Sequence, residues 1–139
     1  MKTLNNSIYR IIFIAVACST FFFLVNAQTV QEWIVPAKFK TMKNPSAASK
    51  ENIANGKDLF AKHCKSCHGS AGLGDGPKAA TLDVPCGDFS SVKFQAQSDG
   101  DLFYKVTEGK GKMPAFKKTI AEDSDRWTLV NYMRTLKGK

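Results

Sequence analysis

The sequence predicts an all-α domain of three helices joined by long loops. Three segments carry apolar residues at helical spacing, and no segment alternates apolar and polar residues as a strand would. The 139 residues suffice for one domain, and a hydrophobic share of 43% with 23% charged residues is typical of a globular protein. This composition excludes a disordered chain, a collagen-like repeat and a protein with many membrane spans.

The N-terminal segment has the pattern of an export signal. Lys2 and Arg10 precede an uncharged run over 11–25, and small residues follow up to Ala27. A short apolar run after a basic start predicts a signal peptide over 1–27, and therefore a periplasmic or otherwise exported protein. The alternative is an uncleaved N-terminal anchor that associates the protein with a membrane, although a spanning helix needs about 20 apolar residues.

Residues 28–50 are predicted to form an extended basic arm. The segment has little periodicity, contains two prolines and carries three lysines over 38–43. Its aromatic side chains, Trp33 and Phe39, are expected to hold the arm against the surface of the folded domain, which covers residues 51–139.

The first helix of the domain is predicted to begin after Ser49, whose side chain can cap the helix at Asn52. Its apolar face consists of Ile53, Gly56, Leu59, Phe60, His63 and Cys64. A glycine inside a helix costs about 1 kcal/mol relative to alanine. Gly56 therefore predicts that another element approaches this helix closely.

A long loop and two further helices follow. Residues 69–92 are rich in Gly, Pro, Asp and Ser, and a loop of this length in a compact domain is expected to wrap something. The second helix is predicted over 101–108 and ends at Gly109. A loop over 110–116 leads to the third helix, which begins near Asp123 with acidic residues in its first turn. Its apolar face consists of Leu129, Tyr132, Met133 and Leu136.

Cys64, Cys67 and His68 form a C-x-x-C-H motif, which in an exported chain predicts covalent attachment of haem. Two thiols three positions apart can reach the two vinyl groups on one porphyrin edge and bind them as thioethers. His68 is then placed to be the proximal ligand of the haem iron. Its other ring nitrogen needs an acceptor, for which backbone carbonyls around Pro77 are candidates.

Two other chemistries use similar cysteine spacing. A thioredoxin-like redox pair also contains C-x-x-C, but it needs a βαβ context that this sequence lacks. A zinc site needs four ligands, and His63 and Cys86 would have to complete it at unusual spacing. Haem attachment accounts better for the complete motif. It leaves Cys86 as a small buried side chain, a free thiol or half of an intermolecular disulfide.

Met113 is the predicted second axial ligand of the iron. It lies in a glycine-containing loop and is followed by Pro114, so it has no helical face to fill. Met42 belongs to the arm, and Met133 lies on the apolar face of the last helix, where packing explains it. Ligation by His68 and Met113 raises the reduction potential relative to ligation by two histidines.

With these residues in place, the chain resembles a class I monohaem c-type cytochrome and is similar to the small bacterial periplasmic ones. The matching features are Gly56 and Phe60, CKSCHG at 64–69, GLGDGP at 72–77, Met113 with Pro114, and Trp127, Leu129 and Tyr132. The resemblance implies a cytochrome c fold, with three main helices and long loops wrapped around one covalently bound haem c and its iron. It also implies that the first and last helices cross where Gly56 meets Leu129 and Tyr132.

An iron with both axial positions occupied by protein has no open place for a substrate. The sequence therefore predicts a one-electron carrier and not an enzyme, shuttling electrons between respiratory membrane complexes and a terminal oxidase or reductase. One alternative is a tethered cytochrome subunit of an electron-transfer complex. A second is a haem sensor or enzyme in which Met113 is labile.

Basic and aromatic residues suggest how the haem is enclosed and approached. The aromatic side chains expected to form the haem wall are Phe60, Phe89, Phe94, Phe103, Phe116, Trp127 and Tyr132.

The lysines that bracket the motif and the methionine loop are Lys62, Lys65, Lys110, Lys112, Lys117 and Lys118. With a formal net charge of +8, they predict redox partners with acidic docking surfaces. Nucleic acid is not expected as a partner, because the chain carries an export signal and no nucleic-acid-binding motif.

Overall fold

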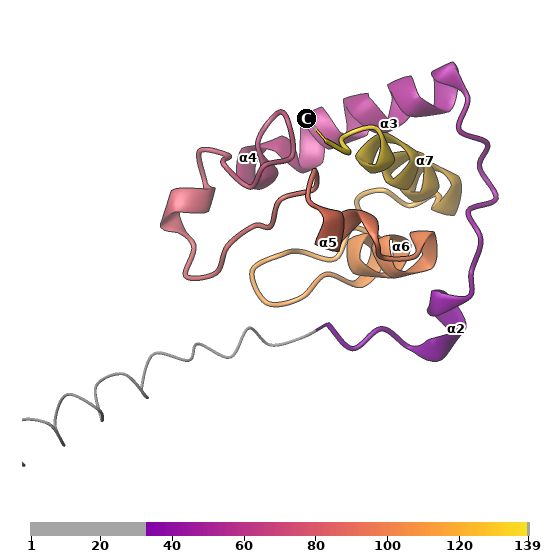
Figure 1. The fold of residues 1–139 in the computed structure, drawn as a ribbon, viewed down its shortest axis with the longest axis horizontal. Coiled ribbons are helices and arrows are strands. Elements are labelled where there is room, and N and C mark those ends of the chain that lie inside the picture. Colours follow the sequence, from indigo (N-terminus) through magenta and orange to yellow (C-terminus); the bar gives the residue numbers. More distant parts are fainter. Residues whose placement is uncertain (1–32, 139) are drawn as a thin grey trace, which may run out of the picture. The chain divides into compact units, whose positions relative to one another are not determined.

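The structure is a computed structural model that describes residues 33–138, and the part from Ile34 onwards lies in one compact unit. The helices, shown in Figure 1, are α2 (Ala37–Lys40), α3 (Lys50–His63), α4 (Lys65–His68), α5 (Val92–Gln95), α6 (Asp99–Glu108) and α7 (Asp123–Arg134), with a 3-10 turn η1 (Ala79–Thr81). The described residues contain no strand, and an isolated bridge joins Lys110 to Met113. The all-α prediction is confirmed, whereas the predicted signal over 1–27 lies outside the described residues.

The three predicted helices are α3, α6 and α7. The Ser49 hydroxyl accepts the N–H of Asn52 at 3.2 Å, as predicted. Helix α6 begins two residues earlier than expected, at Asp99, because Ser98 caps it and the Asp101 side chain accepts the Ser98 N–H in return. Helix α7 ends at Arg134, so Leu136 continues the apolar face from the turn that follows.

The first and last helices cross closely at Gly56. A Cβ atom on Gly56 would lie 2.0 Å from the Thr128 carbonyl oxygen and 3.0 Å from the Cβ of Tyr132. One turn further along α3, the rings of Phe60 and Tyr132 pack at 5.2 Å between centroids. The prediction of Tyr132 as a partner is confirmed. The nearest atoms to this Cβ also include the backbone carbonyl of Thr128, which the sequence did not suggest as a partner.

The arm is more structured than an extended segment. Its short helix α2 packs against α6, where the Phe39 and Tyr104 rings lie 4.8 Å apart. Gly100 permits this approach, since a Cβ there would lie 1.8 Å from the Phe39 carbonyl oxygen. The predicted docking of Phe39 therefore occurs, and that of Trp33 stays a prediction.

Polar contacts fix the end of the arm to α7. The Asn44 side-chain amide donates to Asn131 Oδ1 at 2.8 Å and to the Trp127 carbonyl at 3.3 Å. In return, the Asn131 amide donates to the carbonyls of Ser46 and Ala47, at 3.2 Å each. The arm thus joins the domain through side-chain amides that replace solvent as hydrogen-bond partners.

The core lies where α3, α6, α7 and the loops converge. Its buried aromatic members are Phe60, Phe89, Phe103, Phe116, Trp127 and Tyr132, with Phe94 packed against them in part. The predicted wall residues therefore all belong to one cluster. No helix within residues 33–138 has both the length and the apolar character needed to cross a membrane.

The crossing at Gly56 gives a testable prediction. Gly56→Ala should destabilise the haem-loaded protein by about 1–3 kcal/mol, because the added methyl group overlaps the Thr128 carbonyl. The free energy of unfolding can be measured with denaturant. Lys57→Ala, at the next and exposed position of the same helix, is the control and should change stability by less than about 0.5 kcal/mol. A Gly56→Ala protein more stable than the wild type would mean that α3 and α7 do not approach closely.

Candidate functional site

The C-x-x-C-H motif forms the turn that links α3 to α4. The Cys64 N–H donates to the Phe60 carbonyl at 2.9 Å and so completes the last turn of α3. The N–H groups of Cys67 and His68 then donate back to the Cys64 carbonyl, at 3.1 and 2.9 Å. One helical turn therefore brings together the two thiols and the imidazole that the sequence singled out.

The glycine-rich loop closes on the backbone of this motif. Gly74 donates its N–H to the His68 carbonyl at 2.9 Å, and Gly76 donates to the Cys67 carbonyl at 3.2 Å. A Cβ on Gly76 would lie 2.5 Å from the Ser66 carbonyl oxygen, so a side chain would not fit there. The loop satisfies the carbonyls that the short helix α4 leaves unpaired. This explains why the run GLGDGP follows the motif.

His68 has the surroundings of a metal ligand. Its half-buried ring lies 4.5 Å from the Phe89 ring, and its Nδ1 atom is buried without a hydrogen-bond partner. Burial lowers the pKa of His68, and a backbone interaction with Cys86 opposes that shift in part. Metal ligation requires the neutral imidazole that burial favours. No acceptor for Nδ1 is found among the residues that the structure describes, so the backbone acceptor near Pro77 that the sequence suggested stays a prediction.

The cysteines of the site form no disulfide. Burial, with a smaller contribution from Cys67, raises the pKa of the Cys64 thiol to about 12. Burial and then the charge of Cys67 also raise the pKa of Cys86, which is half-buried and unpaired. The described residues contain no group of three or more His, Cys, Asp or Glu side chains that could hold a metal ion, so nothing in residues 33–138 supports a zinc site.

Met113 lies in a tight hairpin that follows α6 in the sequence. Its N–H donates to the Lys110 carbonyl at 3.0 Å, and the Lys110 N–H donates to the Met113 carbonyl at 2.9 Å. Gly109, with φ of 62°, allows the sharp exit from α6 that this hairpin requires. The side chain of Met113, like that of Cys64, packs against the hydrophobic core cluster. Met133 is buried within that cluster, in agreement with a packing role.

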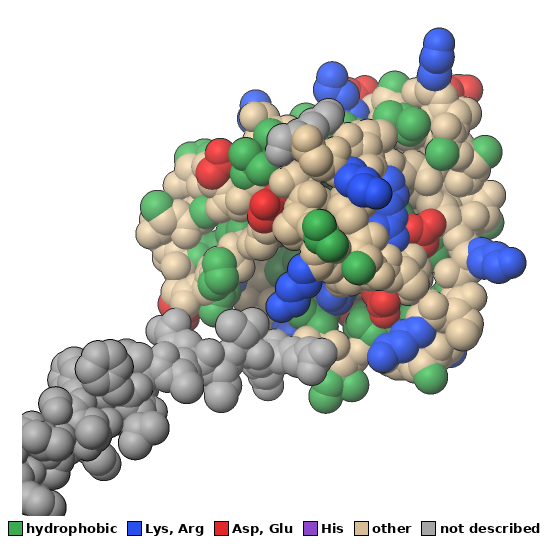
Figure 2. All heavy atoms as spheres, in the orientation of Figure 1, with side chains coloured by type: hydrophobic (Ala, Val, Ile, Leu, Met, Phe, Trp, Pro, Cys, Tyr) green, Lys and Arg blue, Asp and Glu red, His purple; other side chains and the backbone are tan. Residues whose placement is uncertain are grey.

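These residues fit a covalently attached haem. Two free cysteines precede a histidine whose Nδ1 is buried and unsatisfied. The side chains of Cys64 and Met113 pack against the same apolar cluster. Figure 2 shows that the surface of the domain is hollowed on the face drawn, with hydrophobic side chains inside the hollow. Thioethers from Cys64 and Cys67, with His68 and Met113 at the iron, are the roles that this donor set suits.

Fold and motif together define a monohaem c-type cytochrome. Residues 51–133 match the family model described as cytochrome C oxidase, cbb3-type, subunit III. The match covers more than half of the chain, and the chain belongs to this family of c-type cytochrome domains. Its cofactor is covalently bound haem c with its iron, and its function is one-electron transfer.

Relatives and a solved structure agree with this assignment. The chain is 30% identical over 88 residues to a cytochrome c6 of Alaria esculenta, covering 63% of this chain and 95% of the relative. It is 29% identical over 90 residues to a cytochrome c6 of Diacronema lutheri, covering 63% and 99%. The fold is similar to a chain of the Kuenenia stuttgartiensis reducing HAO-like protein complex, with a TM-score of 0.61 and 29% identity. That similarity covers 69% of this chain and about half, 49%, of the neighbour.

The structure adds contacts that the sequence did not reveal. Phe89 was expected in the haem wall, but its contact with the His68 ring follows from the loop path, as does the Phe89 N–H bond to the Gly72 carbonyl at 2.7 Å. Gly72 has φ of 74°, and a Cβ there would lie 2.7 Å from a methyl group of Leu136. The glycine at this position was the available signal that another segment lies close.

The role of the two motif cysteines can be tested directly. Replacing both Cys64 and Cys67 by Ser should give a chain without covalent haem and largely unfolded, because haem fills the centre of so small a core. Haem staining after denaturing electrophoresis measures attachment, and circular dichroism with denaturant measures folding. Cys86→Ser is the matched control and should keep its haem. A compact, cooperatively unfolding double variant would contradict the view that haem forms the core.

Proposed function

We propose that this protein is an exported electron carrier in which His68 and Met113 are the axial ligands of a haem held by Cys64 and Cys67. It carries electrons between respiratory membrane complexes and a terminal oxidase or reductase. The observation that supports the proposal most is the half-buried His68, with its unsatisfied Nδ1, on the same helical turn as two free cysteines. The export signal predicted over residues 1–27 supports the location.

The backbone around Met113 favours a permanent ligand. Both hydrogen bonds of the hairpin and the ring of Pro114 restrict the motion of Met113, so the sulfur can stay in place through many turnovers. Bound haem supplies the one-electron couple, and the chain supplies ligands, an apolar surrounding and the exclusion of water. With both axial positions occupied, no site for a substrate is left. We therefore propose a carrier and not an enzyme.

A second candidate is a cytochrome subunit within an electron-transfer complex. The matching family model is described as an oxidase subunit, and the solved neighbour is a chain of a protein complex. Phe39 and Asn44 of the arm are docked on α6 and α7, so the part of the arm that they hold belongs to the folded domain. The mass of the native particle, measured by light scattering on protein from the source membrane and soluble fractions, separates a free carrier from a subunit.

The ligation proposal predicts the response of the reduced protein to carbon monoxide. The wild-type spectrum should not change, because Met113 occupies the position that the gas would take. Met113→Ala should bind carbon monoxide, lose the weak red absorption band of iron–sulfur(Met) ligation in the oxidised state, and have a lower reduction potential. Visible spectra with and without the gas, and a redox titration, measure these changes.

Met133→Leu is the control for this experiment, since Met133 is buried on α7 and a volume-conserving change should leave the spectrum as in the wild type. A wild-type spectrum that shifts with carbon monoxide would favour the sensor or enzyme alternative. A Met113→Ala protein that keeps the red band would show that another residue is the ligand.

We also propose that basic residues around the motif and the Met113 hairpin steer acidic partners toward the haem. Lys62, Lys65 and Lys112 have exposed side chains, whereas Lys117 is paired with Glu108 at 2.7 Å. Exposed charges of one sign near a reaction site raise association rates at low salt, and this gain falls with ionic strength. Acidic docking surfaces on redox partners would benefit from this field.

Hexacyanoferrate(III), a small anionic oxidant, tests the steering proposal without a protein partner. Lys65→Glu and Lys112→Glu should each slow oxidation of the reduced protein by about twofold or more at low ionic strength. Rates measured by stopped flow should converge with the wild type at about 1 M salt, where the Debye length is about 3 Å. Lys43→Glu, an equal charge change on the arm, should have a smaller effect. Equal slowing by all three variants would indicate net charge and not local steering.

A further inference from the structure

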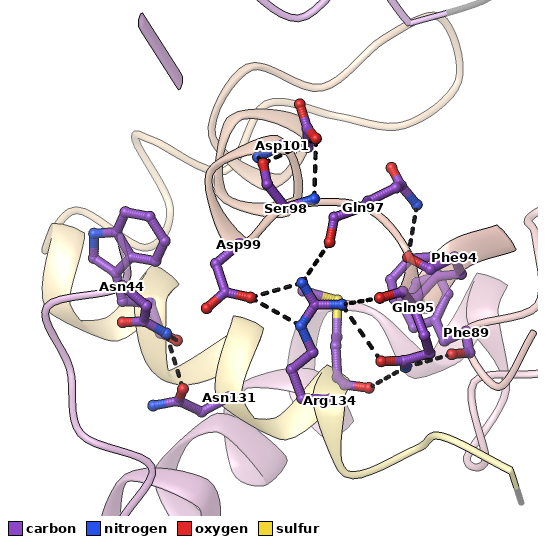
Figure 3. A network of polar contacts seen from close by, with 12 residues as sticks. Asn44, Phe89, Phe94, Gln95, Gln97, Ser98, Asp99, Asp101, Asn131 and Arg134 are labelled. Atoms are coloured by element: carbon purple, nitrogen blue, oxygen red, sulfur yellow. Dashed lines mark hydrogen bonds and ion pairs between the residues drawn. The ribbon is translucent and has the colours of Figure 1, made fainter. Parts of the chain in front are cut away.

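Arg134, the last residue of α7, is the centre of a polar network that the sequence did not suggest (Figure 3). Its Nε and Nη2 atoms donate to Asp99 Oδ1 at 2.8 and 2.7 Å, and Nη2 also donates to the Gln97 carbonyl at 2.6 Å. Its Nη1 atom donates to the carbonyl and to the side-chain oxygen of Gln95, at 2.9 and 3.4 Å. All five N–H groups of the guanidinium thus have acceptors, and all five bonds reach Gln95, Gln97 or Asp99 at and before the start of α6.

Gln95 extends this hydrogen-bond network from Arg134 to Phe89 and Met133. Its side-chain amide nitrogen donates to the Phe89 carbonyl at 2.7 Å and to the Met133 carbonyl at 3.0 Å. Its side-chain oxygen faces Arg134, which orients the amide so that its nitrogen points toward Phe89. One side chain therefore ties the loop before α5 to the last turn of α7.

Phe89 is the residue that this network holds, and it lies against the proposed iron ligand. Its ring is 4.5 Å from the His68 ring and 37° from parallel, and it stacks on Phe94 at 4.3 Å. Its N–H donates to the Gly72 carbonyl at 2.7 Å, so both backbone polar groups of Phe89 are fixed. A ring held at this distance limits the rotation of the imidazole about its own side-chain bonds.

We propose that Arg134 and Gln95 are positioning residues for His68, acting through Phe89. The inference rests on the proposed ligation of iron by His68. The groups that surround a metal-binding histidine set its orientation and tune the metal. The buried Nδ1 of His68 lacks a hydrogen bond, so packing by Phe89 sets the orientation of this ring. Loss of the network should loosen the Phe89 ring and let His68 take more than one orientation.

The experiment uses the haem-loaded protein and two variants. Arg134→Lys keeps the positive charge but loses the planar fork, and Gln95→Leu removes the bonds to Phe89 and Met133 while leaving the Arg134–Asp99 pair. The readouts are the midpoint potential and the hyperfine-shifted signals of the His68 ring in proton NMR of the oxidised protein. Both variants should displace or broaden those signals and change the ferric-to-ferrous ratio at a fixed ambient potential by about threefold or more.

Arg126→Lys is the matched control. Arg126 is also on α7 and is more deeply buried, but its guanidinium bonds the carbonyls of Ile120 and Ala121 and the Asp123 carboxylate, away from Phe89. It should lower thermal stability and leave the His68 signals and the potential unchanged. A Phe89→Leu background completes the test, because Arg134→Lys should add no further change there if it acts through Phe89.

Each outcome bears on a distinct claim. Variants that lose stability like Arg126→Lys but keep the wild-type signals and potential would overturn the positioning role. Effects of Arg134→Lys that persist in full in the Phe89→Leu background would also overturn it. If Arg134→Lys yields no haem-loaded protein, Gln95→Leu alone decides between these results. A wild-type protein without hyperfine-shifted His68 signals would instead refute the ligation by His68.

Discussion

The close crossing of α3 and α7 is the constraint on which the rest of the domain depends. Gly56 lets the backbone of α3 reach the Thr128 carbonyl, and Phe60 packs on Tyr132 one turn later. Because Cys64 follows Phe60 by one further turn of the same helix, the crossing decides where the C-x-x-C-H turn leaves α3. Helix packing thus places the chemistry, although the residues at the crossing carry no chemistry themselves.

The glycine-rich loop supplies hydrogen bonds that the short helix at the motif lacks. A short helix such as α4 leaves carbonyls without partners, and the backbone N–H groups of Gly74 and Gly76 satisfy two of them. The same loop passes beside Phe89 and Leu136, so the motif, the loop and the end of α7 form one packed unit. Such rigidity suits a one-electron carrier, because a site that keeps its shape on oxidation and reduction wastes little energy on rearrangement.

Much of the fold and of the candidate site was predictable, because the relevant signals are local. The cap at Ser49, the end of α6 at Gly109 and the motif at 64–68 each depend on residues within one or two turns. The hairpin at Met113 is local in the same sense. The features that were not predicted depend on contacts between segments that are distant in the sequence. The approach of the Thr128 carbonyl to Gly56 and the helix α2 in the arm were not predicted, because those features depend on which faces meet in space.

The sequence by itself determined the class of fold, the haem motif and the methionine loop, since spacing along one segment fixes which side chains can act together. Only the tertiary structure decided that Asn44 meets Asn131, that Phe89 covers His68 and that Arg134 reaches Gln95. These partners lie far apart along the chain. The packing of the whole core determines which of these residues meet. A single hydrogen bond or ring contact contributes too little free energy to require a recognisable sequence pattern.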